Sequence, residues 1–301
     1  MAVSGGPDSL ALLLLAHAAL PERVIAATID HGLRFEAAAE ARKVAGICEA
    51  IGVPHETVRV ILASGNLQHR ARDARYEALC RSFGSRGAGV FATAHHADDQ
   101  AETMLMRLNR GSGLAGLAGI RERAVMEACD PSTRFLVVRP LLNWRREELA
   151  RIVSSAGMDP VSDPSNEDER FDRVRVRQAL SALPWLDPLA IARSAAHLQE
   201  AESAVEEAVA QAACKAIVRE GEVTWLLSGH SSLIELELVA GILREHGANV
   251  PRSAVARMIA QLRSDGHASL GGVIARRARH RADETAQLDA WRFEREPPRR
   301  A

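Results

Sequence analysis

The stretch Ser4-Gly5-Gly6-Pro7-Asp8-Ser9, followed at once by the apolar run from Leu10 to Leu15, decides the fold of this chain. Glycine admits backbone angles and close approaches that a Cβ forbids, and hydroxyl groups flank the two glycines where a strand is expected to become a helix. The sequence therefore predicts a loop that holds phosphate groups. Neither Gly-x-x-x-x-Gly-Lys-Ser/Thr nor Gly-x-Gly-x-x-Gly occurs at this position, so the common kinase-type and dinucleotide-type loops are excluded here.

Taken alone, this loop is weak evidence, because a Gly-Pro turn capped by Asp and Ser is common. Three further polar motifs follow along the chain. They are Asp30-His31-Gly32-Leu33-Arg34, Ala94-His95-His96-Ala97-Asp98-Asp99-Gln100-Ala101-Glu102-Thr103, and Arg107-Leu108-Asn109-Arg110-Gly111-Ser112-Gly113. The presence of all four motifs in one chain is what supports the interpretation of the first as a phosphate loop.

Apolar runs and amphipathic segments alternate around these motifs, which is typical of an α/β domain with a parallel sheet. The predicted strands are residues 24–29, 57–62 and 90–94, and the predicted helices are residues 37–51, 73–83 and 98–108. Because the motifs follow the carboxyl ends of predicted strands, we expect them to converge on one crevice at that edge of the sheet. Only three residues precede the loop, whereas a strand usually needs about five or six. We therefore expect a short or missing central strand and a less rigid loop.

Together the motifs closely resemble the tRNA(Ile)-lysidine synthases, members of the N-type ATP pyrophosphatase (PP-loop) superfamily. The segments Asp163-Pro164-Ser165-Asn166 and Arg173-Val174-Arg175-Val176-Arg177 are also similar to that family. The resemblance implies a Rossmann-like catalytic domain over residues 1–185. It also implies an ATP-dependent ligase that adenylates C2 of the wobble cytidine in the CAU anticodon of an isoleucine tRNA. Free lysine would then replace AMP to form lysidine, changing codon recognition from AUG to AUA.

The resemblance further implies roles for particular residues, with ATP and Mg²⁺ as cofactors. For the nucleotide these residues are Ser4, Gly5, Gly6, Pro7, Asp8, Ser9, Arg34 and Gly111, with Asp8 also contacting Mg²⁺. For free lysine they are Asp99 and Glu102, which would neutralise an amine, and Arg75, which would receive the carboxylate. For the tRNA they are Arg107, Arg110, Arg173, Arg175 and Arg177.

The amine of lysine must lose a proton to become a nucleophile, so a neighbouring base such as Asp30 or His95 is needed. With Asp99, these two are the catalytic candidates. Asp99 and Glu102 are spaced i, i+3 and face the same way on a helix. From the residues alone, their cluster with His95 and His96 also suits zinc or manganese, and that alternative stays open.

Composition sets outer bounds on these interpretations. The 301 residues are 47% hydrophobic and 26% charged, enough for two globular domains. No apolar stretch has membrane-spanning length and no signal peptide precedes the loop, so we expect a cytoplasmic enzyme. No Cys-x-x-Cys pair occurs, which argues against the tRNA-thiolating relatives and assigns the cysteines to packing. The net charge of −1 does not indicate RNA binding. The arginines nevertheless cluster locally, as binding to the phosphate backbone of RNA requires.

The character of the sequence changes beyond residue 185. Residues 186–293 are predicted to form a linker helix and a smaller, mainly helical second domain, with strands at 223–227 and 269–275, and residues 294–301 a disordered tail. The second domain is expected to hold tRNA, to stabilise the first, or to form a homodimer surface. The glycine-rich segment after Arg110 reads equally well as a flexible cover over nucleotide and RNA or as a loose connector. Two other functions stay open: another PP-loop tRNA-modifying ligase, and a non-catalytic RNA-binding protein on this scaffold.

Overall fold

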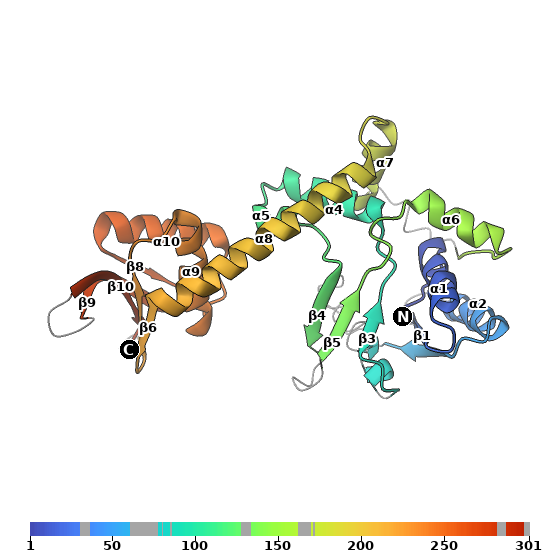
Figure 1. Cartoon of the computed structure of the whole chain (residues 1–301), viewed down its shortest axis with the longest axis horizontal. Coiled ribbons are helices and arrows are strands. Elements are labelled where there is room, and N and C mark those ends of the chain that lie inside the picture. Colours follow the sequence, from blue (N-terminus) through green and yellow to red (C-terminus); the bar gives the residue numbers. More distant parts are fainter. Residues whose placement is uncertain are drawn as a thin grey trace. The chain divides into compact units, whose positions relative to one another are not determined.

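The computed structural model describes residues 1–30, 37–60, 78–79, 81–84, 86–127, 134–161, 170, 172–281 and 287–297. The predicted site residues Arg34 and Arg75 and the turn at residues 163–166 lie outside these ranges. The chain divides into two compact units, Met1–Gln199 and Glu200–Ala301 (Figure 1). This division falls within helix α8 (Pro188–Ala216), whereas the sequence predicted a boundary at residue 185.

The first unit has a largely parallel sheet. Its strands are β1 (Ala26–Asp30), β2 (His55–Arg59), β3 (Val90–Ala92), β4 (Arg123–Glu127) and β5 (Arg134–Val138). Strand β1 pairs with β2 and β3 pairs with β5, both in parallel, while β4 runs antiparallel to β5. The parallel α/β architecture predicted from the sequence is thus confirmed for this unit.

The first three residues lie between β1 and β3 and connect the two groups of strands. The amide of Val3 donates to the carbonyl of Ala27 at 2.9 Å, and the amide of Ala2 donates to the carbonyl of Ala92 at 3.3 Å. Ala2 forms only an isolated parallel bridge with Ala27. The expected short central strand is therefore present as a single pairing step, buried at Val3.

The first unit also contains several helices. They are α1 (Pro7–Ala19), α2 (Ala37–Ala50), α4 (Ala97–Asn109), α5 (Leu114–Leu117), α6 (Arg146–Ser155), α7 (Asp172–Ala182) and the first part of α8. Helix α1 is apolar on nearly all sides, which is typical of a buried helix, and Leu10, Leu12 and Leu13 are at most 2% exposed. It packs against α6 and shares a core with Val44 of α2. This packing fixes the helix that begins at the predicted phosphate loop.

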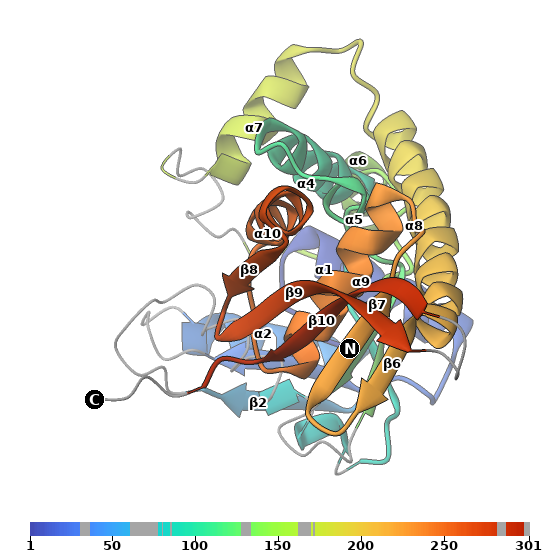
Figure 2. The ribbon, with the colours of Figure 1, turned by 90° about the vertical axis from the view of Figure 1, so that its left-hand side faces the viewer.

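The second unit is not mainly helical, so that part of the prediction was wrong. A five-stranded antiparallel sheet in the order β6-β7-β10-β9-β8 carries α9 (Ser232–Glu245) and α10 (Arg252–Asp265) on one face (Figure 2). The strands are β6 (Ile217–Glu220), β7 (Val223–Leu227), β8 (His267–Leu270), β9 (Val273–Arg281) and β10 (Gln287–Arg295). Leu238, Ile242 and Phe293 form part of its core.

Charge explains why most of β9 and all of β10 were missed. Strand β9 reads Val-Ile-Ala-Arg-Arg-Ala-Arg-His-Arg, and only Val273, Ala275 and His280 are buried, so arginines obscure the period of two. Strand β10 contains Glu294 and Arg295, which the sequence analysis had assigned to a tail. The amide of Glu296 also donates to the carbonyl of Gly272 at 2.8 Å.

Among the helices that the structure describes, none has both the length and the apolarity needed to cross a membrane.

Candidate active site

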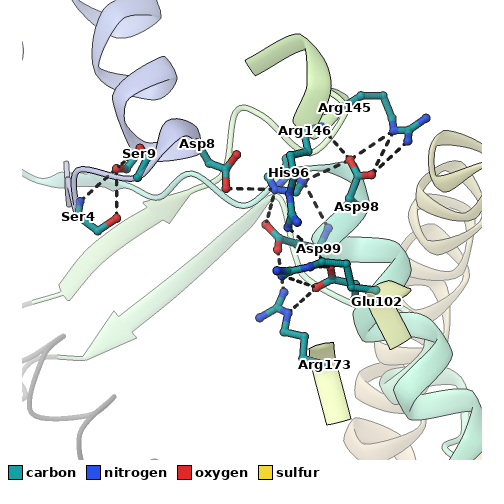
Figure 3. Close-up of polar contacts among 12 residues, drawn as sticks. Ser4, Asp8, Ser9, His96, Asp98, Asp99, Glu102, Arg145, Arg146 and Arg173 are labelled. Atoms are coloured by element: carbon teal, nitrogen blue, oxygen red, sulfur yellow. Dashed lines mark hydrogen bonds and ion pairs between the residues drawn. The ribbon is translucent and has the colours of Figure 1, made fainter. Parts of the chain in front are cut away.

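The predicted phosphate loop is folded by its own hydroxyl groups. The Ser4 amide donates to Ser9 Oγ at 3.1 Å, and Ser9 Oγ donates to the Gly6 carbonyl at 3.0 Å (Figure 3). Gly6 is the N-cap of α1, and no side chain caps that helix. The first turn of α1 therefore presents backbone amides and the positive end of the helix dipole, as an anion site requires.

Gly5 gives the loop its shape. Its φ is +87°, and its carbonyl accepts a hydrogen bond from the Val161 amide at 2.8 Å. A Cβ on Gly5 would lie 2.8 Å from Val161 Cγ2 and 3.0 Å from Val44 Cγ2. Both the conformation and the space demand glycine at this position. The short central strand has thus not left the loop without support.

His96 is the centre of a charged cluster next to the loop. It is fully buried as the N-cap of α4, and its Nε2 lies 3.4 Å from Asp8 Oδ2 and 3.4 Å from Asp99 Oδ2 (Figure 3). Its Nδ1 lies 3.5 Å from Asp98 Oδ2. These distances describe ion pairs more than short hydrogen bonds. His96 thereby connects the phosphate loop to the first turn of α4.

The surroundings of His96 keep its ring charged. Burial by itself would lower its pKa, but the contacts with Asp8 and Asp98 and the charge of Asp99 outweigh burial and raise the pKa to about 9. The Asp99 amide also points at Nδ1, at a long 3.4 Å, which would suit a neutral ring. With three carboxylates around the ring, we take the imidazolium to be the resident state.

Asp98 faces away from the loop and fixes α4 to α6. Arg145 donates to it from Nε at 3.3 Å and Nη2 at 3.2 Å, and the Arg146 amide donates at 2.8 Å. Burial alone would raise the pKa of Asp98, but the hydrogen bonds from His96, the Arg146 amide and Arg145 hold it well below its ordinary value. Asp98 is therefore an anionic structural residue.

Asp99 and Glu102 lie side by side, as their spacing predicted, but arginines of α7 hold them. Arg173 donates from Nη2 to Asp99 Oδ1 at 2.9 Å and from Nε to Glu102 Oε2 at 2.6 Å (Figure 3). Arg177 donates from Nε to Glu102 Oε1 at 2.7 Å. Burial opposes ionisation of Asp99, yet His96 and Arg173 lower its pKa. Asp99 is thus anionic.

The five arginines predicted to contact tRNA separate into groups. Arg173 and Arg177 are one turn apart on α7 and face Glu102, as described. Arg107 donates to the carbonyls of Gly116 and Gly119 at 2.7 and 3.1 Å, so its guanidinium holds the segment after α4. Arg110 and Arg175 both pair with Asp172 and have more than half of their side chains exposed. Of the five, only Arg110 and Arg175 face solvent as arginines on a tRNA-binding surface would.

Gly111, which stays a predicted nucleotide contact, lies beyond the C-terminal end of α4. It follows α4, whose 13 residues span about 20 Å from the N-cap at His96. The segment that follows Gly111 is held by hydrogen bonds and is not a loose connector. Gln100, only 2% exposed, receives a hydrogen bond from the Ile120 amide at 2.6 Å and donates to the Ile120 carbonyl at 3.1 Å.

The two predicted bases lie at the carboxyl ends of their strands. Asp30 ends β1, and His95 follows β3, with Nδ1 2.9 Å from Thr93 Oγ1. Parallel strands place these ends at the same edge of the sheet as the loop. His96 was named from the sequence only as part of the zinc or manganese alternative; its place immediately before the first turn of α4 was the signal for its role as N-cap.

Among the residues that the structure describes, Asp8 offers a carboxylate oxygen that suits Mg²⁺. Asp8 Oδ1 is buried and makes no hydrogen bond, so one carboxylate oxygen beside the loop is available to a cation. In the part of the chain that the structure describes, no group of three or more His, Cys, Asp or Glu side chains could hold a metal ion. The zinc or manganese alternative is therefore not supported there. Mg²⁺ commonly uses one or two carboxylates together with substrate phosphates, and Asp8 suits that mode.

A hydroxyl-lined glycine loop, an uncapped buried helix and a parallel sheet define a protein of the PP-loop class. The family model described as the PP-loop domain matches residues 1–183. Among solved structures, the U34-tRNA thiolase NcsA from Methanococcus maripaludis has a TM-score of 0.54, covering 66% of this chain and 71% of that one. At 19% identity, it shows the fold alone.

Sequence identity to curated relatives shows which family within the PP-loop class this chain belongs to. The tRNA(Ile)-lysidine synthase of Novosphingobium aromaticivorans is 44% identical, covering 100% of this chain and 90% of its own. That of Zymomonas mobilis is 41% identical over 100% of this chain and 89% of its own. The chain belongs to the tRNA(Ile)-lysidine synthase family of ATP-dependent ligases, which confirms the resemblance read from the motifs.

Proposed function

We propose that this protein converts the wobble cytidine of an isoleucine tRNA with a CAU anticodon to lysidine. The C2 oxygen of cytidine attacks the α-phosphate of ATP, forming an adenylate ester and releasing pyrophosphate. The amine of free lysine then attacks C2, and AMP leaves with the C2 oxygen. The codon that this tRNA recognises would change from AUG to AUA. Because ATP and tRNA are both present in the cytoplasm, we propose that the reaction takes place in that compartment.

One observation carries the proposal: the carboxylates expected to bind lysine are joined to the phosphate loop. Asp99 and Asp8 share the buried cation His96, each at 3.4 Å from Nε2. An adenylated base at the loop would therefore lie near the group that receives the amine. Proximity of this kind can supply a large part of a catalytic effect.

The loop residues have separate tasks in this scheme. The amides at the start of α1 and the hydroxyls of Ser4 and Ser9 orient the phosphates, and Gly6 permits close approach. When bound, Mg²⁺ offsets charge on the phosphates, with Asp8 as its protein contact. Asp30 and His95 remain the proposed bases for the attacking amine, and Arg34 and Arg75 the proposed anion contacts. The homodimer surface also stays a prediction.

The decisive assay is transfer of labelled lysine to an unmodified isoleucine tRNA transcript with the CAU anticodon, in ATP and Mg²⁺. Elongator methionine tRNA, which has the same anticodon, is the control. Label on the isoleucine tRNA alone supports the proposal. Release of pyrophosphate without label would leave the ATP chemistry and exclude lysine as the nucleophile, and absence of both signals would favour a non-catalytic RNA-binding protein.

Changing Asp99 to Asn should separate the two steps. The amide keeps the shape but loses the charge that a lysine ammonium needs, so KM for lysine should rise about 10- to 100-fold. Pyrophosphate release with tRNA alone should fall much less, because adenylation precedes lysine attack. Asp159→Asn, at a carboxylate that is 89% exposed in a pair with Lys43, is the matched control. Equal losses in both steps would contradict the assignment of Asp99 to lysine.

Changing Arg175 to Ala should weaken tRNA binding without affecting ATP. Its side chain is 62% exposed on α7, and loss of one phosphate contact should reduce the slope of log K against log salt by about 1. Arg193→Ala removes an arginine of similar exposure, 64%, and is expected to change neither slope nor affinity. Filter binding at several salt concentrations measures both. A fall in ATP affinity would instead place Arg175 in the nucleotide pocket.

A further inference from the structure

A guanidinium group of the protein already lies between Asp99 and Glu102. Arg173 contacts both carboxylates with one fork, at 2.9 Å through Nη2 and 2.6 Å through Nε. Glu102 is only 1% exposed and also accepts from Arg177, with Arg146 Nη2 at 3.6 Å. Arginines of the chain itself therefore already pair with both acids.

This arrangement shows which ligand the two acids suit best. A planar guanidinium presents parallel donors in a fixed geometry, while an ammonium is a compact point charge with rotatable donors. Carboxylates arranged for a fork bind arginine more strongly than lysine, because bidentate contacts add both energy and direction. Left vacant, this position would favour free arginine over free lysine.

Free arginine would be an unproductive occupant of a lysine site. Its side chain stays protonated in proteins and does not become a nucleophile at neutral pH. Arg173 prevents this without removing the acids, because a carboxylate oxygen has two lone pairs and can accept a second, single donor. The ammonium of lysine needs only such single positions.

Resting on the proposed function, in which Asp99 and Glu102 bind lysine, we propose that Arg173 determines specificity by filling the guanidinium-shaped position between them. Arg173 thereby excludes free arginine and related guanidinium compounds and leaves room for an ammonium. Its side chain is 41% exposed, so it lies where an incoming amino acid would meet it. Arg173 acts as a specificity-determining residue and takes no part in bond making.

The test is inhibition of lysine transfer by free L-arginine in the wild type and in Arg173→Met, which keeps the length of the side chain and removes the fork. We expect the inhibition constant of arginine to fall at least about tenfold in the variant, competitively with lysine. Arg86→Met, whose arginine is 39% exposed beside Glu56, is the matched control and should behave as wild type. An unchanged constant in Arg173→Met would overturn the proposal.

Direct binding of labelled L-arginine to Arg173→Met protein, measured without tRNA, gives a readout independent of activity. Binding by the variant and not by the wild type supports the assignment, and binding by neither overturns it. Arg173→Lys keeps the charge without the fork and should also gain arginine binding; wild-type behaviour there would overturn the role of the fork. Arginine binding by Arg173→Met combined with no lysine transfer by the wild type would contradict the proposed function and leave the guanidinium site standing.

Discussion

Replacing His96 with Asn is expected to destabilise the first unit by about 3 to 5 kcal/mol, because it removes the buried cation that three carboxylates share. Asp8, Asp98 and Asp99 all lie within 3.5 Å of the ring. Asn retains a polar N-cap, so the loss reports the charge more than the cap. Hydrogen exchange of peptides from α1 and α4 measures this unit separately from the second.

The effect of this change should depend on pH with a definite sign. The pKa of His96 is raised from 6.5 to about 9 in the folded protein, so the folded state binds the proton more tightly than the unfolded chain does. Its contribution, about 3 kcal/mol from a shift of this size, is fully present below about pH 6.5. It is lost as the pH rises through about 9. The difference in unfolding free energy between wild type and His96→Asn should therefore shrink over that interval.

His95→Asn is the matched control for stability. His95 is the neighbouring residue, but it is only half-buried and contacts Thr93. Its replacement should cost much less, because it leaves the cation shared by Asp8, Asp98 and Asp99 in place. Measurements in EDTA and without nucleotide keep Asp8 free of bound metal throughout. A pH-independent loss in His96→Asn would mean that the ring is neutral in the folded protein.

Replacing Gly5 with Ala should have the second large effect. Ala at φ +87° costs about 1 to 2 kcal/mol, and forcing a methyl group against packed side chains typically adds about 1 to 3 kcal/mol. The methyl group would meet Val161 at 2.8 Å and Val44 at 3.0 Å. Because the loop cannot keep its path, we expect ATP affinity to fall along with the stability of α1, measured by calorimetry and hydrogen exchange.

Gly6→Ala provides a matched control one residue away. Gly6 has φ −70°, which alanine adopts readily, and its added Cβ would have only Ser4 Oγ nearby, at 3.7 Å. Stability without ATP should be nearly unchanged there, even if a methyl group facing the phosphates reduces ATP affinity. Similar destabilisation in both variants would show that the strain at Gly5 is not the cause.

The sequence predicted the parallel fold of the first unit because its signals are local. A glycine loop before an apolar helix, and polar motifs after short apolar runs, depend on neighbouring residues only. The same reasoning paired Asp99 with Glu102 correctly, since i and i+3 positions on a helix are adjacent. It could not show that Arg173 and Arg177 reach those acids, because that contact joins α4 to α7 across a large separation in sequence.

Two other differences have the same kind of cause. His95 and His96 are indistinguishable by residue type, and only burial at the helix N-cap makes His96 the shared cation of the cluster. In the second unit, arginines on β9 obscured the alternation of a strand. In each case tertiary position decided the role.

The position of residues 1–3 between β1 and β3 has a consequence for how the protein is made. These residues leave the ribosome long before β3, yet the hydrogen bond from Ala2 to the Ala92 carbonyl cannot form until Ala92 has been synthesised. Strand β5, which extends the sheet beyond β3, is made later still. Folding of this unit during translation should therefore begin late, and anything that captures residues 1–3 on the nascent chain should delay it.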